Sequence, residues 1–209
     1  MLYYPKSIIY KQDQMKTKGL YKKTRPIGAI IHTTAGSQNQ TYQEAIDWAI
    51  KESICSYLVI DRAGLVAQST PFNKWGSHAG ASFWPGANNI TGVSQYFLGI
   101  ELICPGLLKK TGGNYYTSFN KKIDDINQVR LDKKGRAFFK LSIEQENSLV
   151  ELLNYLEREF RQYGFSFSNI FGHDEVCEPL GRKSDPGASL SMTMPEFRSK
   201  LLKEWLIKP

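Results

Sequence analysis

Two histidines that lie far apart in the chain stand in phrases suited to metal binding. His32 ends an apolar run, and His173 stands between Gly172 and Asp174. Taken singly, each is better explained as a core histidine held by hydrogen bonds. Both, however, follow predicted strands, and ligand sites in α/β sheets assemble at strand ends. Because imidazole is a common zinc ligand, the pair predicts a shared metal site.

A third ligand should be a carboxylate or a thiolate, and Asp185 and Cys177 both qualify chemically. We favour Asp185 because its loop is shaped by neighbours: Gly181 and Gly187 permit tight turns, and Pro186 stiffens the chain after the acid. Two imidazoles and one carboxylate leave a fourth tetrahedral position open. Hydrolytic zinc sites have this arrangement.

Two further charged residues could turn such a site into a catalytic one. Lys183 precedes Asp185 by two residues and could stabilise negative charge on a tetrahedral intermediate, although alone it is better explained as a surface cation. Glu101 lies inside an apolar strand whose alternation separates it from Leu98 and Ile100. It is either a general base that faces a cleft or one half of a salt bridge on an open sheet face.

His78, the third histidine, stands among small residues in the phrase from Trp75 to Gly80. No predicted strand end supports it as a metal ligand. We expect it to contact substrate from a loop that lines a pocket, and a structural surface histidine is the alternative.

The elements that must position these residues alternate between strands and amphipathic helices. Capping boxes at Thr41 and Ser142 open two helices, which run to about residue 52 and to Gly164, and a third helix begins near Pro195. Strands are expected over residues 27–32, 57–60, 65–68, 97–103 and 169–172. Residues 105–141 form a long insertion, with a hairpin around 115–119. This alternation predicts a single α/β domain with a central mixed β-sheet flanked by helices.

The 209-residue length suits one well-buried core. The net charge of +7 is concentrated in a basic N-terminal leader, residues 1–25, where seven basic residues face one acid. We interpret the leader as a solvated segment or as one attracted to a polyanion such as cell wall, and we expect no nucleic-acid partner because no binding motif accompanies the charge. We expect no membrane span and no signal peptide. Three cysteines without a Cys-x-x-Cys pair argue against a disulfide framework.

Five segments together resemble the type 2 zinc N-acetylmuramoyl-L-alanine amidases, whose fold is shared with peptidoglycan recognition proteins and phage amidase endolysins. The matching segments are residues 31–36, 56–64, 75–80, 98–102 and 172–187, in that order. The zinc amidase domain would then span residues 26–209, with the insertion at about 105–141.

The resemblance implies zinc held by His32, His173 and Asp185, with Glu101 as the catalytic acid and Lys183 as the cation beside the third ligand. It also implies hydrolysis of the amide between N-acetylmuramic acid and L-alanine of peptidoglycan.

The chain departs from the family pattern at Tyr57, where many members have a histidine. We expect Tyr57 and Trp75 to contact substrate together with His78, although an aromatic residue such as Trp75 can equally belong to the core.

The sequence leaves two alternatives to this enzyme: a non-catalytic peptidoglycan-binding module on the same fold, and a zinc hydrolase of an amide outside the wall. A phage lysin, a delivered antibacterial toxin and a recycling enzyme would all have such a sequence, so a holin or immunity partner cannot be predicted. We expect synthesis in the cytoplasm and action on the wall after release or delivery, or recycling in the cytosol.

Overall fold

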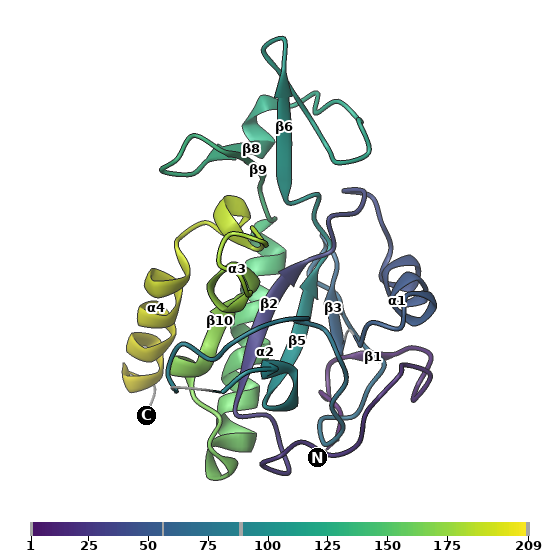
Figure 1. Cartoon of the computed structure of the whole chain (residues 1–209), viewed down its shortest axis with the longest axis vertical. Helices are drawn as coiled ribbons and strands as arrows, with labels where there is room; N and C mark the ends of the chain where they lie inside the picture. The colour runs from purple at the N-terminus through teal and green to yellow at the C-terminus, as the bar shows by residue number, and fades with distance from the viewer. Residues whose placement is uncertain (1, 56, 88–89, 208–209) are drawn as a thin grey trace.

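A six-stranded mixed sheet forms the centre of the protein (Figure 1). The computed structural model describes residues 2–55, 57–87 and 90–207. Ser56, which begins the second matching segment, lies outside the described residues, as do Lys208 and Pro209. The strands of the sheet, in their spatial order, are β1 (Ile8–Ile9), β4 (Val66–Gln68), β3 (Leu58–Ile60), β5 (Phe97–Leu102), β2 (Gly28–Thr33) and β10 (Ile170–Gly172).

Four of these strands run parallel and end at the same edge of the sheet. Strand β2 pairs in parallel with β5 and with β10, and β5 pairs in parallel with β3. The register places His32 of β2 directly beside Glu101 of β5. Gly172 of β10 pairs with Ile31, so the next residue of each strand brings His173 level with His32. The sheet therefore delivers three candidate site residues to one edge.

Helices cover the sheet, and two of them begin at the predicted capping boxes. They are α1 (Tyr42–Lys51), α2 (Ile143–Phe160), α3 (His173–Val176) and α4 (Met194–Ile207). Thr41 and Ser142 form the capping boxes of α1 and α2. Short 3-10 helices span Val93–Gln95, Ile126–Gln128, Arg161–Tyr163, Phe167–Asn169 and Gly187–Ser189. None of the helices in the described part of the chain combines the length and apolarity that a membrane crossing needs.

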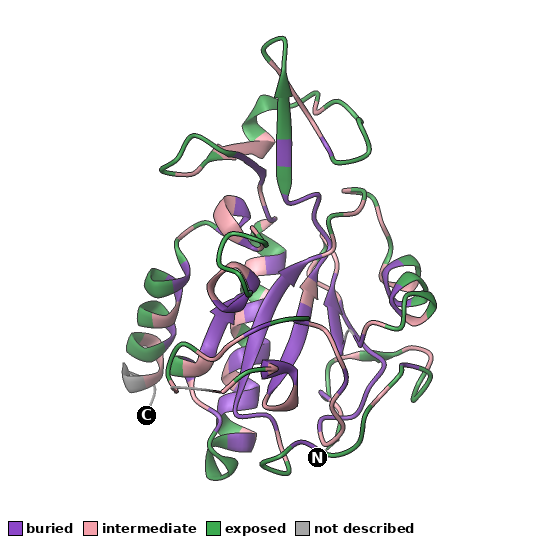
Figure 2. Ribbon diagram, viewed as in Figure 1, coloured by how far each residue is buried: buried purple, intermediate pink, exposed green. Residues whose placement is uncertain are grey.

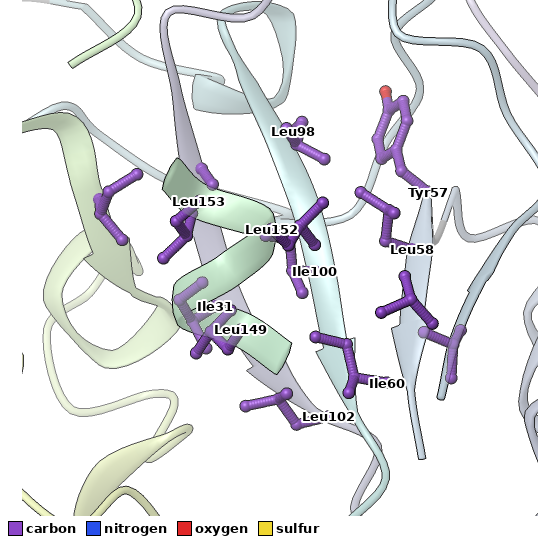
Figure 3. Packing of buried hydrophobic residues seen from close by; sticks show 14 of the residues in the cluster. Ile31, Tyr57, Leu58, Ile60, Leu98, Ile100, Leu102, Leu149, Leu152 and Leu153 are labelled. Atoms are coloured by element: carbon purple, nitrogen blue, oxygen red, sulfur yellow. The ribbon is translucent and has the colours of Figure 1, made fainter. Parts of the chain in front are cut away.

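The main core lies between α2 and the sheet, and Figure 3 shows leucines of α2 against Ile31, Ile100 and Leu102 of β2 and β5. Figure 2 shows the central strands almost entirely buried. On the opposite face a smaller cluster surrounds Ile30 and Phe97. Alternation along β5 thus puts Ile100 in the main core and Glu101 on the face away from it, as the sequence predicts.

Residues 105–141 form a second sheet that projects beyond the carboxyl edge of the first (Figure 1). In spatial order its strands are β7 (Asn114–Tyr116), β6 (Leu107–Thr111), β9 (Ala137–Phe139) and β8 (Val129–Leu131). Close to the hairpin expected around 115–119, the chain reverses over residues 117–121, where Tyr116 bridges Lys122 and the Thr117 N–H donates to the Lys121 carbonyl. A second turn, which the sequence did not predict, lies at Gly112 and Gly113, which both have positive φ angles that favour glycine, and Thr111 pairs with Asn114.

The first 25 residues lie against the domain rather than apart from it. Tyr4, Met15 and Tyr21 are buried members of the main core, and the two-residue β1 extends the sheet beside β4. Two leader lysines are exposed or half-exposed in ion pairs, Lys6 with Glu151 and Lys11 with Asp47. The leader therefore combines core packing with a basic outer surface.

Candidate metal centre and active site

The side chains of His32, His173 and Asp185 converge on one point at the carboxyl edge of the sheet. The two Nδ1 atoms are 3.0 Å apart, and Asp185 Oδ2 lies 3.2 Å from His173 Nδ1 and 3.4 Å from His32 Nδ1. Both histidines are buried. Cys177 is not part of this group, because its thiol is buried and directed at the Asp174 carbonyl.

Each imidazole is oriented by the hydrogen bond that its Nε2 atom forms. His173 Nε2 lies 3.1 Å from the carbonyl oxygen of Ala79, which can only accept, so Nε2 carries the hydrogen. In neutral His173 the lone pair is then on Nδ1. Similarly, Nε2 of His78 lies 2.9 Å from the Phe97 carbonyl, so His78 donates there.

The orientation of His78 in turn determines the tautomer of His32. Burial lowers the pKa of His78 well below 6.5, so its ring is neutral and its Nδ1 is an acceptor. This Nδ1 lies 3.0 Å from His32 Nε2, which must donate. The lone pair of neutral His32 is left on Nδ1, aimed at Asp185. Gly99 leaves room for this arrangement, since a Cβ there would come within 2.9 Å of the His78 ring.

Several contacts hold the loop of Asp185 and the short helix of His173 in place. The Asp174 N–H donates to the Asp185 carbonyl at 2.9 Å. Glu175 accepts from the Gly172 N–H at 2.9 Å and forms a bidentate ion pair with Arg198 of α4. These bonds tie β10, α3 and α4 to one another, so His173 has a fixed position.

The three ligand atoms fit a tetrahedral zinc ion. A tetrahedron with bonds of about 2.1 Å places its ligands about 3.4 Å apart, close to the three separations observed here. Burial opposes ionisation of Asp185, but the two imidazoles that face its carboxylate outweigh burial and hold the Asp185 pKa below its usual range. Burial also lowers the pKa of His32, which favours the neutral imidazole that a metal requires.

Glu101 lies beside this centre and has the properties of a proton carrier. It lines the same cavity as His32, and its Oε2 is buried without a hydrogen-bond partner among the described residues. Burial raises its pKa to about 8; the charge of Asp185 adds to the rise, and Lys183 opposes it. A salt bridge on an open sheet face is not formed within the described structure.

The cavity is about 710 Å³ in volume, and Lys183 is one of the residues that line it. Lys183 is exposed and lies on the same loop as Asp185, two residues before it. Its charge acts on both Glu101 and His32. A carbonyl group that enters the cavity would therefore find a cation, a carboxyl group and the candidate metal ligands together.

The predicted substrate contacts are corrected by the structure in two cases. Tyr57 is fully buried in the main core and accepts a hydrogen bond from the Gly76 N–H. Trp75 packs against the main core under the Lys18 ammonium and does not line the cavity. His78 does line it, but both of its nitrogens already have protein partners. Its position predicts support of His32 rather than hydrogen bonding to substrate.

Two aromatic residues that the sequence interpretation did not select border the cavity. Trp48 of α1 is 51% exposed and Phe119 of the insertion is 75% exposed. The buried face of α1 includes Ala45 and Ala49, and Trp48 is not part of this face. The helical spacing of the two alanines therefore indicates that Trp48 points outward. For Phe119 the sequence offers no comparable sign, because its surroundings lack periodicity.

Comparison with protein families identifies the relatives of this chain. The family model described as N-acetylmuramoyl-L-alanine amidase matches residues 22–188. A comparison with curated protein sequences gave no match.

Solved structures share the fold at low sequence identity. A selenomethionine derivative of AmpD has 16% identity and a TM-score of 0.58, with 94% of this chain and 95% of that chain covered. AmiD from E. coli, in complex with anhydro-N-acetylmuramic acid-L-Ala-D-gamma-Glu-L-Lys, has 19% identity and a TM-score of 0.58; 89% of this chain and 60% of AmiD are covered. The endolysin amidase LysCS from Clostridium intestinale URNW has 19% identity, a TM-score of 0.56 and coverage of 97% and 99%.

Proposed function

Because this chain belongs to the N-acetylmuramoyl-L-alanine amidase family, we propose that it is a zinc-dependent peptidoglycan hydrolase. The bond cut is the amide between the lactyl group of N-acetylmuramic acid and L-alanine of the stem peptide. One observation carries the proposal: His32, His173 and Asp185 converge at one point, with Glu101 and Lys183 in the same cavity. A peptide such as the L-Ala-D-gamma-Glu-L-Lys bound by AmiD represents the class of substrate.

Zinc held by His32, His173 and Asp185 would supply a Lewis acid for the attacking water and the scissile carbonyl. Glu101 accepts the proton of the water molecule as its oxygen adds to the carbonyl carbon. Burial raises the pKa of Glu101 above the ordinary carboxyl range, so the group holds the proton that it accepts and can release it in the next step. Glu101 transfers it to the nitrogen of L-alanine as the carbon–nitrogen bond breaks. The products are a lactyl carboxylate and a free amine.

Lys183 stabilises the negative charge that develops on the carbonyl oxygen. Lys183 is exposed and lines the cavity, on the loop that also carries Asp185. Electrostatic groups fixed before the reaction lower the barrier without reorganising during it. The hydrogen bond from the Asp174 N–H to the Asp185 carbonyl holds the same loop two residues after Lys183.

The test is cleavage of purified wall material by the purified protein. Mass spectrometry should detect stem peptides with a free L-alanine amine, and a chelator should stop their release until zinc is restored. Wall binding without release would identify the chain as a non-catalytic binding module. Release of amines only from small amides unrelated to the wall would point to a different amide hydrolase. Either result would refute the proposed reaction.

A further inference from the structure

The cavity at the metal centre continues outward between α1 and the insertion. A second cavity, here called the outer cavity, has a volume of about 510 Å³. It shares four lining residues with the first cavity: Gly36, Gln40, Trp48 and Phe119. Figure 1 shows the insertion above the carboxyl edge of the main sheet, with β8 and β9 on the side of β6 that faces away from α1. A substrate held at the metal centre therefore has a continuous path into the outer cavity.

Two apolar side chains are presented to solvent where the cavities join. Trp48 comes from α1 and Phe119 from the loop after β7, and both are at least half exposed. Large exposed aromatic groups that border a cavity offer contact area to a ligand at little conformational cost.

The insertion is also strongly basic, with nine lysines and arginines against three aspartates over residues 105–141. Lys121 and Lys122 line the outer cavity, and Lys109 lines the inner one. Lys109 and Lys122 both pair with Tyr116, from the two sides of that strand, so the three residues share one face of the sheet. Lys109, Lys121 and Lys122 form no ion pair with another described residue.

The one carboxylate among the described residues that line the outer cavity already has hydrogen-bond partners. Glu44 lines the outer cavity, but it accepts hydrogen bonds from the Thr41 N–H and hydroxyl in the capping box of α1. The lysine charges are therefore available to an external anion.

We propose that the outer cavity is a subsite for the stem peptide, in which Lys121 and Lys122 bind peptide carboxylates and Trp48 and Phe119 contact the apolar parts. This inference rests on the proposed function. In that substrate the lactyl carboxyl group is consumed in the scissile amide, so the glycan side has no charge to offer. The peptide side does, because a γ-linked glutamate keeps its α-carboxylate and the chain ends in another. Charge complementarity therefore favours the peptide over the glycan.

Two muropeptides with the same sugar test the subsite. One has a dipeptide stem with amidated carboxyl groups, and the other has a four-residue stem with free carboxylates. For the Lys121→Ala/Lys122→Ala variant, the ratio of kcat/KM for the long stem to that for the short stem should fall about three- to tenfold, as two partly exposed ion pairs are lost. Phe119→Ala should lower the same ratio.

The matched control is Lys133→Ala/Lys134→Ala, which removes two exposed lysines of the same insertion that line neither cavity. It should keep the wild-type ratio. An equal fall in the control would mean that only the overall charge of the insertion matters. A further series keeps the stem neutral and varies the length of the glycan. If the loss of kcat/KM in the Lys121→Ala/Lys122→Ala variant grew with glycan length in this series, the cavity would be assigned to the glycan. Both results would overturn the subsite.

Calorimetry with the free four-residue peptide and chelator-treated protein separates this proposal from the proposed function. Binding that weakens in the Lys121→Ala/Lys122→Ala variant, and is retained in the control, supports the subsite even if the wild type cleaves neither muropeptide. Equal binding by all three proteins would refute it.

Discussion

Nδ1 of His78 lies 3.0 Å from Nε2 of His32, so one histidine of the chain holds another in the tautomer that a metal requires. Replacing His78 by Leu removes the acceptor and should weaken zinc binding about 10- to 100-fold, the usual effect of losing such a supporting contact. His78→Asn keeps an acceptor oxygen close to the position of Nδ1 and should recover much of the affinity. Competition with a chromophoric chelator measures both constants. Equal affinity in wild type and His78→Leu would show that the contact does not support the ligand.

Replacement of Glu101 by Gln separates proton transfer from metal binding. The amide retains the shape of the side chain but cannot accept a proton, so kcat should fall by about 10²- to 10⁴-fold. Zinc content should stay at the wild-type level, because Glu101 is not among the converging ligand atoms. Metal analysis and the muropeptide assay measure the two properties on the same sample. Unchanged turnover would leave Glu101 with a purely structural role.

Removal of the metal should lower stability, because a ligand that binds only the folded chain stabilises it by mass action. At zinc concentrations 100 times the dissociation constant the gain is about 2.7 kcal/mol. Thermal unfolding with and without a chelator should show this difference in wild type. In Asp185→Ala the zinc-dependent increase should be lost together with activity. A variant that still gains stability from zinc would exclude Asp185 as a ligand.

The pH dependence of stability in the chelator-treated protein should expose the raised pKa of Glu101. The folded chain binds a proton there up to about pH 8, whereas the unfolded chain releases it near 4.5. The free energy of unfolding should therefore fall as pH rises from 7 to 8, with a slope of at most about 1.4 kcal/mol per pH unit. The pKa values of His32 and His78 are lowered in the folded chain, so these residues affect stability mainly below pH 6.5. There the free energy of unfolding falls as the pH falls.

Glu101→Gln is the control for this measurement. Other groups with raised pKa values, such as the Cys55 thiol, contribute equally in wild type and in Glu101→Gln. The difference between the two slopes of unfolding free energy against pH therefore reports Glu101 alone. Urea unfolding at several pH values measures it. Parallel slopes would mean that Glu101 titrates normally in the folded chain.

The strands that carry the site could be predicted because their sequences are continuous and apolar. The runs that end at His32 and at Gly172 became β2 and β10, and alternation assigned Glu101 to the face opposite Ile100. Strand ends then brought the two histidines together, as expected for parallel strands. Preference for Asp185 over Cys177 followed from the shape of its loop, and the structure groups Asp185 with the histidines.

The insertion and the substrate contacts could not be predicted for a physical reason. Strands of the second sheet are short and rich in polar residues, and Leu107 pairs with Phe138, thirty-one positions away. Local patterns do not contain such pairings. Tyr57 has a hydroxyl that could have reached solvent, but a partner at Gly76 satisfies it inside the core.

The second sheet also supports the loop that carries Asp185, the proposed third metal ligand. Phe138 packs so closely on Gly187 that a Cβ there would come within 2.4 Å of its ring. Arg130 donates to the carbonyls of Ala188 and Leu190, and the Leu141 N–H donates to Ser189 at 3.0 Å. Trimming the protein to a smaller catalytic unit by excising residues 105–141 would therefore loosen Asp185 at the same time. An engineer who wished to exchange this segment between related enzymes would have to transplant residues 186–190 with it.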